Sequence, residues 1–149
     1  NVGLFIVAHD AMHGSLAPFR PRLNLAVGRL ALALYAGFSF DRLAPKHFAH
    51  HRHPGTADDP DFDPDHPQAL IPWFITFIRQ HFGWREFALQ VLIAAPYLIL
   101  FEVTFANLIL FWAIPAMLSA FQLFYFGTYR PHRHDEMPFV DGHRARSED

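Results

Sequence analysis

A chain of 149 residues, of which 52% are hydrophobic and only 17% are charged, is too apolar for a soluble domain of this size and favours an integral membrane protein. The formal net charge of −2 provides no excess of Lys and Arg for binding phosphate, which excludes a nucleic-acid partner. The absence of cysteine excludes disulfides, thiolate zinc sites and iron–sulfur clusters, so any metal must be held through nitrogen or oxygen.

The first half of the chain alternates apolar and polar segments that predict helices near a membrane surface. Residues 1–8 are typical of the end of a membrane helix that leads into the sequence HDAMHG. Residues 23–40 form an apolar stretch interrupted by Arg29, and a central Arg costs at least ~2.5 kcal/mol in a membrane helix. We therefore expect this stretch to lie in the interface or to re-enter instead of crossing. Residues 41–66, rich in His, Asp and Pro, predict a polar segment that ends in a loop.

The second half predicts a short interfacial helix and a membrane hairpin, which makes the fold class all-α. Residues 70–78 are short, aromatic and followed by Arg79, which favours the interface. Residues 87–129 contain one charged residue, Glu102, and as a single helix would extend roughly 65 Å, about twice the ~30 Å bilayer core. We predict two membrane helices joined by a turn near residues 102–107. All twelve Lys and Arg lie outside this hairpin, so the positive-inside rule predicts that the His-rich segments face the cytoplasm.

Two groups of histidines have the spacing of metal ligands. His9 and His13 are four residues apart, and His47, His50 and His51 are three and four apart, so each group shares one helix face. The first pair alone equally indicates hydrogen-bonded histidines at a helix end, and it carries Asp where a zinc protease has Glu. Together the five nitrogens exceed the four ligands of a structural zinc site, which predicts more than one metal ion. Such a nitrogen-rich set suits Fe, Cu, Ni or Zn, and the spacing does not choose among them.

Four motifs resemble one enzyme family along almost the whole chain. They are HDAMHGS at 9–15, HFAHHRHPGT followed by DPDF at 47–62, QLFYFGTYRPHR at 122–133 and DGHRARS at 141–147. These motifs are similar to those of bacterial β-carotene ketolases, in the membrane fatty-acid-desaturase-like superfamily. The family carries a further HxxHH box after the HRARS-like segment, and it has earlier N-terminal helices. We therefore expect residues 1–149 to form a single partial desaturase-like domain, a fragment of a longer chain.

The resemblance implies a non-haem di-iron oxygenase in the bacterial inner membrane, with its His boxes facing the cytoplasm. Such an enzyme uses O₂ and electrons from a small ferredoxin-like protein. The implied substrate is β-carotene, whose ring C4 methylene becomes a ketone to give echinenone and then canthaxanthin. The resemblance implies that the iron ligands are His9, His13, His47, His50 and His51, with His132 and His143 as further candidates; His134 stays an alternative to these two.

Several other residues have a structural and a functional interpretation. Prolines break the EF-hand spacing of the loop aspartates, which either face solvent or accept hydrogen bonds from ligating imidazoles: Asp58, Asp59, Asp61, Asp63 and Asp65. We expect His53 to face solvent or to bond a loop carbonyl, and we interpret His66 and His81 as ordinary polar residues. Four aromatic residues either line a channel for a long polyene or are ordinary interfacial residues: Phe121, Phe124, Tyr125 and Phe126.

The same histidines are compatible with two other classes of function, one enzymatic and one not. A carotenoid hydroxylase or an acyl-lipid desaturase of the same superfamily would use the same ligands, and product analysis separates them from a ketolase. A non-enzymatic, His-rich membrane metal-binding protein is disfavoured, because transporters place polar ligands near the bilayer midplane.

We expect the 149 residues alone to be inactive, because five to seven imidazoles leave the implied site incomplete. The measurement is carotenoid analysis of β-carotene-producing cells that express only this segment. Ketone formation there would contradict the ligand count.

Overall fold

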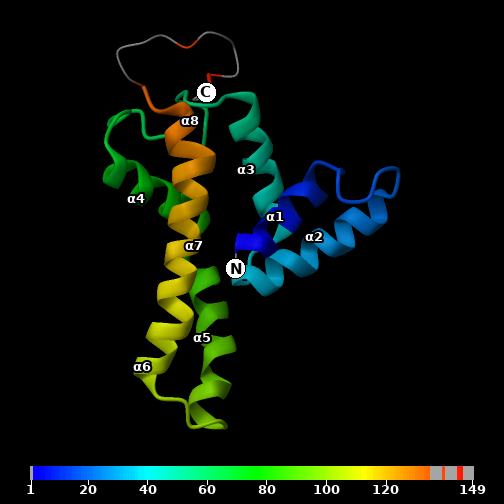
Figure 1. Ribbon diagram of the computed structural model, residues 1–149, viewed down its shortest axis with the longest axis vertical. Helices are drawn as coiled ribbons and strands as arrows, with labels where there is room; N and C mark the ends of the chain where they lie inside the picture. Colours follow the sequence, from blue (N-terminus) through cyan, green and yellow to red (C-terminus); the bar gives the residue numbers. More distant parts are fainter. Residues whose placement is uncertain (1, 135–138, 140–143, 146–149) are drawn as a thin grey trace. The chain divides into compact units, whose positions relative to one another are not determined.

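The regular structure of the chain is helical, as the apolar periodicity predicts (Figure 1). The computed structural model describes residues 2–134, 139 and 144–145, and within these ranges it contains no strand. In chain order the helices are α1 (Val2–Met12), α2 (Pro21–Ala36), α3 (Phe40–Arg52), α4 (Leu70–His81), α5 (Trp84–Ile99), α6 (Phe105–Leu108), η1 (Ile109–Ala113), α7 (Ile114–Phe124), η2 (Tyr125–Tyr129) and α8 (Arg130–His132). The η segments are π-helical turns. The all-α expectation is confirmed.

The helices belong to two compact units that are interleaved along the sequence. The first unit comprises residues 1–44 and 84–120, and the second comprises residues 45–83 and 121–149. Each unit has a hydrophobic core of its own. The two histidine groups therefore fall in different units, with the 9/13 pair in the first and the 47/50/51 group in the second.

In the first unit, α1 packs along α2 and the loop between them is held by one buried side chain. The side chain of Asn24 accepts a hydrogen bond from the Ala17 backbone N–H at 3.0 Å and donates to the Ala17 carbonyl at 2.9 Å. Pro21 at the first turn of α2 has no N–H to leave unpaired, and Gly37 ends the helix in the left-handed conformation with φ of 70°. The buried core residues of this unit are Ala8, Ala31, Leu32 and Leu43.

Arg29 does not enter the core, and the chain turns sharply soon after it. Its guanidinium donates to both carboxylate oxygens of Asp41 at 3.0 Å, and both side chains are exposed. Between α2 and α3 the helix axis bends by 96°. The expectation that residues 23–40 lie in the interface or re-enter stays a prediction, because a bent helix pair of this kind is compatible with a broken span or with a re-entrant loop.

The predicted hairpin is present, with α5 as one arm and the helix that begins at α6 as the other (Figure 1). The turn contains Glu102 at φ of 50°, and Thr104 accepts the backbone N–H of Asn107 at 3.3 Å to cap the second arm. The indole of Trp112 donates to the Gln90 side-chain oxygen at 3.1 Å and so joins the two arms. The turn lies at residues 100–104, so it includes Glu102 as predicted, whereas residues 105–107 already belong to α6.

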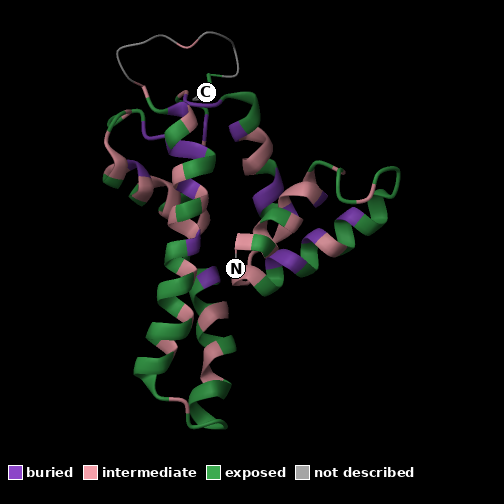
Figure 2. Ribbon diagram, in the orientation of Figure 1, coloured by how far each residue is buried: buried purple, intermediate pink, exposed green. Residues whose placement is uncertain are grey.

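Only one arm of the hairpin reaches the length of a membrane span. Residues 105–132 form a continuous 28-residue apolar helix that is long enough to cross, whereas α5 has 16 residues and a span needs about 20. Of the two membrane-spanning helices that we predicted, the helix at 105–132 has the length of a span, and α5 is shorter. Figure 2 shows α5 and residues 105–118 of the long helix mostly exposed, whereas the rest of that helix is largely buried or half-buried. Large apolar side chains such as Leu92, Ile99 and Phe111 account for this surface, which suits a lipid environment.

The second unit is built around an aromatic core between α4 and the end of the long helix. Trp73 and Phe124 are both fully buried, and Phe62 and Tyr129 complete the cluster. The Tyr129 hydroxyl donates to the Gln68 carbonyl at 2.7 Å and so ties the helix to the loop before α4. This packing explains Phe124 as a core residue, so it does not face a channel.

Phe121 and Tyr125 pack beside the same aromatic core, and their rings stack on each other with centroids 6.0 Å apart. Phe126 points outward and is 57% exposed. The four aromatic residues that the sequence groups together therefore divide between core and surface.

We predict that Gly28→Ala destabilises the protein, because an added Cβ would overlap the Phe40 ring and lie 3.1 Å from the Ala11 Cβ. The expected cost is about 1–3 kcal/mol, as for overpacked cores. Gly3→Ala is the matched control on α1, since its Cβ would meet nothing within 4 Å and Ala favours a helix over Gly. Thermal unfolding of the full-length protein in detergent measures both, and equal melting temperatures would contradict the packing.

Candidate metal centre

His9 and His13 lie side by side at the end of α1. The His13 backbone N–H bonds the His9 carbonyl at 3.1 Å, which continues the helical turn and brings the ring centroids to 4.6 Å. Partial burial and the neighbouring His9 lower the pKa of His13, while Asp10 opposes this shift. A lowered pKa keeps the imidazole neutral, which is the form that binds metal. The spacing of four residues therefore produces the adjacent pair that the sequence predicts.

The second box, on α3, divides into a pair and a single residue. His47 and His51 face each other with their Nε2 atoms 3.1 Å apart, one ring donating to the other. His50 projects toward a different set of neighbours. Its Nδ1 lies 3.0 Å from both carboxylate oxygens of Asp59, and its ring centroid is 5.1 Å from that of His132. Two kinds of environment therefore exist within one HxxHH sequence.

Asp59 is buried and anchored by backbone donors. Its carboxylate accepts the Gly55 N–H at 2.8 Å and the Asp61 N–H at 2.9 Å. The loop can curl around the carboxylate because Gly55 adopts φ of 64°, a conformation that favours glycine. Of the two interpretations of the loop aspartates, hydrogen bonding to an imidazole holds for Asp59, whereas Asp58 and Asp65 are exposed.

The contact between His50 and Asp59 determines which ring nitrogen is suited to a metal. A carboxylate accepts the Nδ1–H, so the lone pair of the neutral ring lies on Nε2. Metal-ligating histidines commonly donate their other N–H to a carboxylate in this way, which fixes the ring and raises its basicity. Both carboxylates near His50 approach its Nδ1, with Asp59 at 3.0 Å and Asp61 at 3.9 Å. The arrangement therefore fits a metal ion bound by the Nε2 of His50, with Asp59 orienting the ring.

His81 is not the ordinary polar residue that we expected from the sequence. Its side chain is only 9% exposed, and its Nε2 contacts the carboxylate of Asp61. Burial alone would raise the pKa of Asp61, but the hydrogen bond and charge of His81 and the charges of His50 and His47 lower it overall. Nothing in the sequence near residue 81 signals this contact, because the partner lies in a loop before α4.

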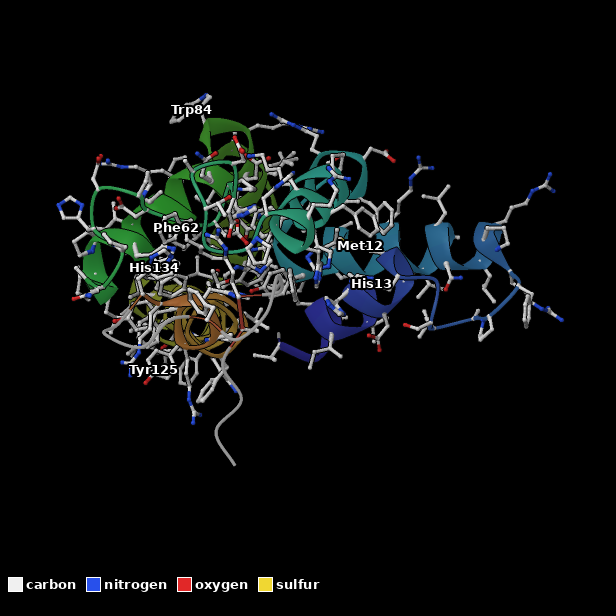
Figure 3. The ribbon with its side chains drawn as sticks, turned by 90° about the horizontal axis from the view of Figure 1, so that it is seen from above. Met12, His13, Phe62, Trp84, Tyr125 and His134 are labelled. Carbon is white, nitrogen blue, oxygen red and sulfur yellow. The ribbon has the colours of Figure 1, made fainter. Side chains whose placement is uncertain are left out.

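The remaining histidines differ in what their ring nitrogens contact. His132 is buried, and its Nδ1 donates to the Arg144 carbonyl at 2.7 Å, which leaves the Nε2 lone pair for a ligand. The Nε2 of His134 instead donates to the Gly55 carbonyl at 2.9 Å, and its ring stacks on Phe62. Figure 3 labels His134 and Phe62, which lie near each other. Of these two candidates, the contacts favour His132 as a ligand.

Three further histidines complete the set named from the sequence. His143 lies outside the described residues. His53 is exposed, in agreement with the expectation that it faces solvent. His66 is also exposed, with its Nδ1 3.5 Å from Asp63.

Comparisons with known proteins place the chain in a family. The chain is 50% identical over 147 residues to the beta-carotene ketolase of Paracoccus sp. strain N81106, covering 99% of this chain and 59% of that protein. It is 42% identical over 137 residues to the beta-carotene ketolase of Haematococcus lacustris, covering 91% of this chain and 42% of that protein. The zeaxanthin 4-ketolase of Chlamydomonas reinhardtii is 43% identical over 131 residues, covering 87% of this chain and 29% of that protein.

The chain spans less than two thirds of the length of these relatives. No solved structure matches it. Residues 1–91 match the model of the family described as fatty acid desaturase, which is more than half of the chain. The chain therefore belongs to the fatty acid desaturase family.

Proposed function

We propose that the full-length protein is a carotenoid ketolase, a membrane oxygenase that converts the C4 methylene of the β-ionone ring of β-carotene to a ketone. The choice of substrate is supported by the 50% identity to a beta-carotene ketolase over 99% of this chain. The observation that carries the metal-dependent chemistry is the buried His50 backed by the Asp59 carboxylate. Echinenone is the expected first product and canthaxanthin the second.

We propose a site for two non-haem iron ions held mainly by imidazoles. The proposed ligands are His9, His13, His47, His50, His51, His132 and His143. When bound, the irons supply the activation of O₂ and the oxidation of the ring C–H, with electrons from a ferredoxin-like protein. The lowered pKa of His13 favours the neutral ring that this role requires.

The chain's own part in this function is to hold ligands in position and to keep water away. Asp59 fixes the ring of His50, and two backbone N–H groups fix Asp59 in turn. The fully buried side chains of Trp73 and Phe124 fill the space beneath this loop. Tightly packed residues of this kind limit the movement of the His50 ring and exclude water, which reduces side reactions during oxidation.

We further propose that the enzyme lies in the bacterial inner membrane with its histidine boxes at the cytoplasmic side. The apolar helix at 105–132 and the exposed apolar hairpin support membrane insertion. The twelve Lys and Arg residues lie outside residues 87–129, in the segments that carry the histidines, which supports this orientation.

We predict that β-carotene-producing cells that express the full-length protein accumulate 4-keto carotenoids. Carotenoid extraction with chromatography and mass spectrometry measures this, with cells that carry an empty vector as control. An alcohol as the end product would identify a hydroxylase, and a new double bond in membrane acyl chains would identify a desaturase. Either outcome would overturn the ketolase proposal.

We predict that His50→Ala in the full-length protein lowers ketone formation at least ~100-fold and lowers the iron content, because it removes a ligand held by a dedicated carboxylate. His53→Ala is the matched control, since His53 lies three residues away and is exposed. Product analysis and iron determination on the purified variants measure both effects. Wild-type iron content in His50→Ala would contradict its role as a ligand.

A further inference from the structure

We propose that His81 is a positioning residue for the second histidine box, which acts by holding the Asp61 carboxylate away from the Nδ1 of His50. This inference rests on the proposed function, in which the Nε2 of His50 binds a metal ion. It concerns a residue that is neither part of the box nor near it in the sequence.

His81 has a side chain that is only 9% exposed, and its hydrogen bonding is incomplete. It ends α4, and its ring packs against Phe77 with centroids 4.9 Å apart. Its Nε2–H donates to the Oδ1 of Asp61. Its Nδ1 is buried and has no hydrogen-bond partner among the residues that the structure describes. An unpaired buried polar atom costs stability, so the contact with Asp61 is the interaction that a histidine provides here.

Asp61 stands between His81 and His50. Its Oδ1 faces His81, while its Oδ2 lies 3.9 Å from the Nδ1 of His50. That nitrogen already donates to Asp59 at 3.0 Å. The backbone N–H of Asp61 in turn donates to Asp59 at 2.9 Å. The two carboxylates therefore lie on the same side of the His50 ring, and only one of them is hydrogen-bonded to it.

The Asp61 carboxylate needs a hydrogen-bond donor, because burying a charge without a partner is costly. Asp61 is 7% exposed, and a buried carboxylate requires a donor. Among the described residues, the Trp73 indole donates to the backbone carbonyl of Asp61 and leaves its carboxylate to other donors. Besides His81, the described side chain within ion-pair distance of the Asp61 carboxylate is His50, whose Nδ1 lies 3.9 Å from Oδ2 and could take over as donor if His81 were removed. The His50 ring would then be shared by two carboxylates and would rotate from its present direction.

The test measures metal binding to the full-length protein after its metal has been removed with a chelator. Co²⁺ is titrated against a competing chelator, and its absorption spectrum reports nitrogen coordination. We expect His81→Phe, which keeps a ring but removes the donor, to weaken Co²⁺ binding about tenfold, the range measured for residues that orient metal ligands. His81→Gln keeps an N–H donor and is expected to bind Co²⁺ like the wild type.

Two further variants keep the result interpretable. His66→Phe removes an exposed histidine from the same unit, and it should leave Co²⁺ binding unchanged. If His81→Phe fails to fold, His81→Asn replaces it, because its shorter amide does not reach Asp61 while that of His81→Gln does. The melting temperature of each metal-free variant is measured in parallel.

Wild-type Co²⁺ affinity in His81→Phe would overturn the inference. So would equal weakening in His81→Phe and His81→Gln together with lower melting temperatures of both metal-free proteins, because this is the result of a purely structural role. The wild-type protein tests the proposed function separately, through its iron content and ketone products. Absence of both, with a Co²⁺ affinity that still depends on residue 81, would reject the oxygenase and retain the positioning role.

Discussion

The hydrogen bond between the buried Asp59 carboxylate and His50 is the interaction that orients the buried histidine of the second box. The carboxylate accepts two backbone N–H groups of its own loop and the Nδ1–H of His50. These bonds compensate for the removal of a charge from water. Because the loop closes around the carboxylate, its position relative to α3 is determined by the backbone and not by a flexible side chain. One imidazole is thereby held with a defined nitrogen for a ligand.

The histidines of the second box differ in the residues that they contact. His47 and His51 contact each other, whereas His50 contacts a carboxylate and packs beside His132. The contacts in the second unit provide this difference within five consecutive residues of α3.

The apolar surface of the hairpin agrees with membership of the fatty acid desaturase family. A family model covers residues 1–91, and the apolar 28-residue helix follows at 105–132. Large apolar side chains remain exposed on this helix and on α5, an arrangement that is stable when lipid covers it. Burial inside the protein is found instead in the core of the first unit around Ala8 and Leu32, and in the second unit around the Asp-rich loop and its neighbouring aromatic residues.

Features that depend on residues close in sequence could be predicted from the sequence alone. The adjacency of His9 and His13, the turn near Glu102 and the helical fold all follow from local spacing and apolar periodicity. The pairing of His81 with Asp61, the burial of Asp59 and the core position of Phe124 could not be predicted, because each depends on segments far apart in the chain. Local chemistry sets which residues can bind a metal or a proton. Tertiary packing alone decides which carboxylate meets which imidazole, since a buried charge takes the donor that the fold brings to it.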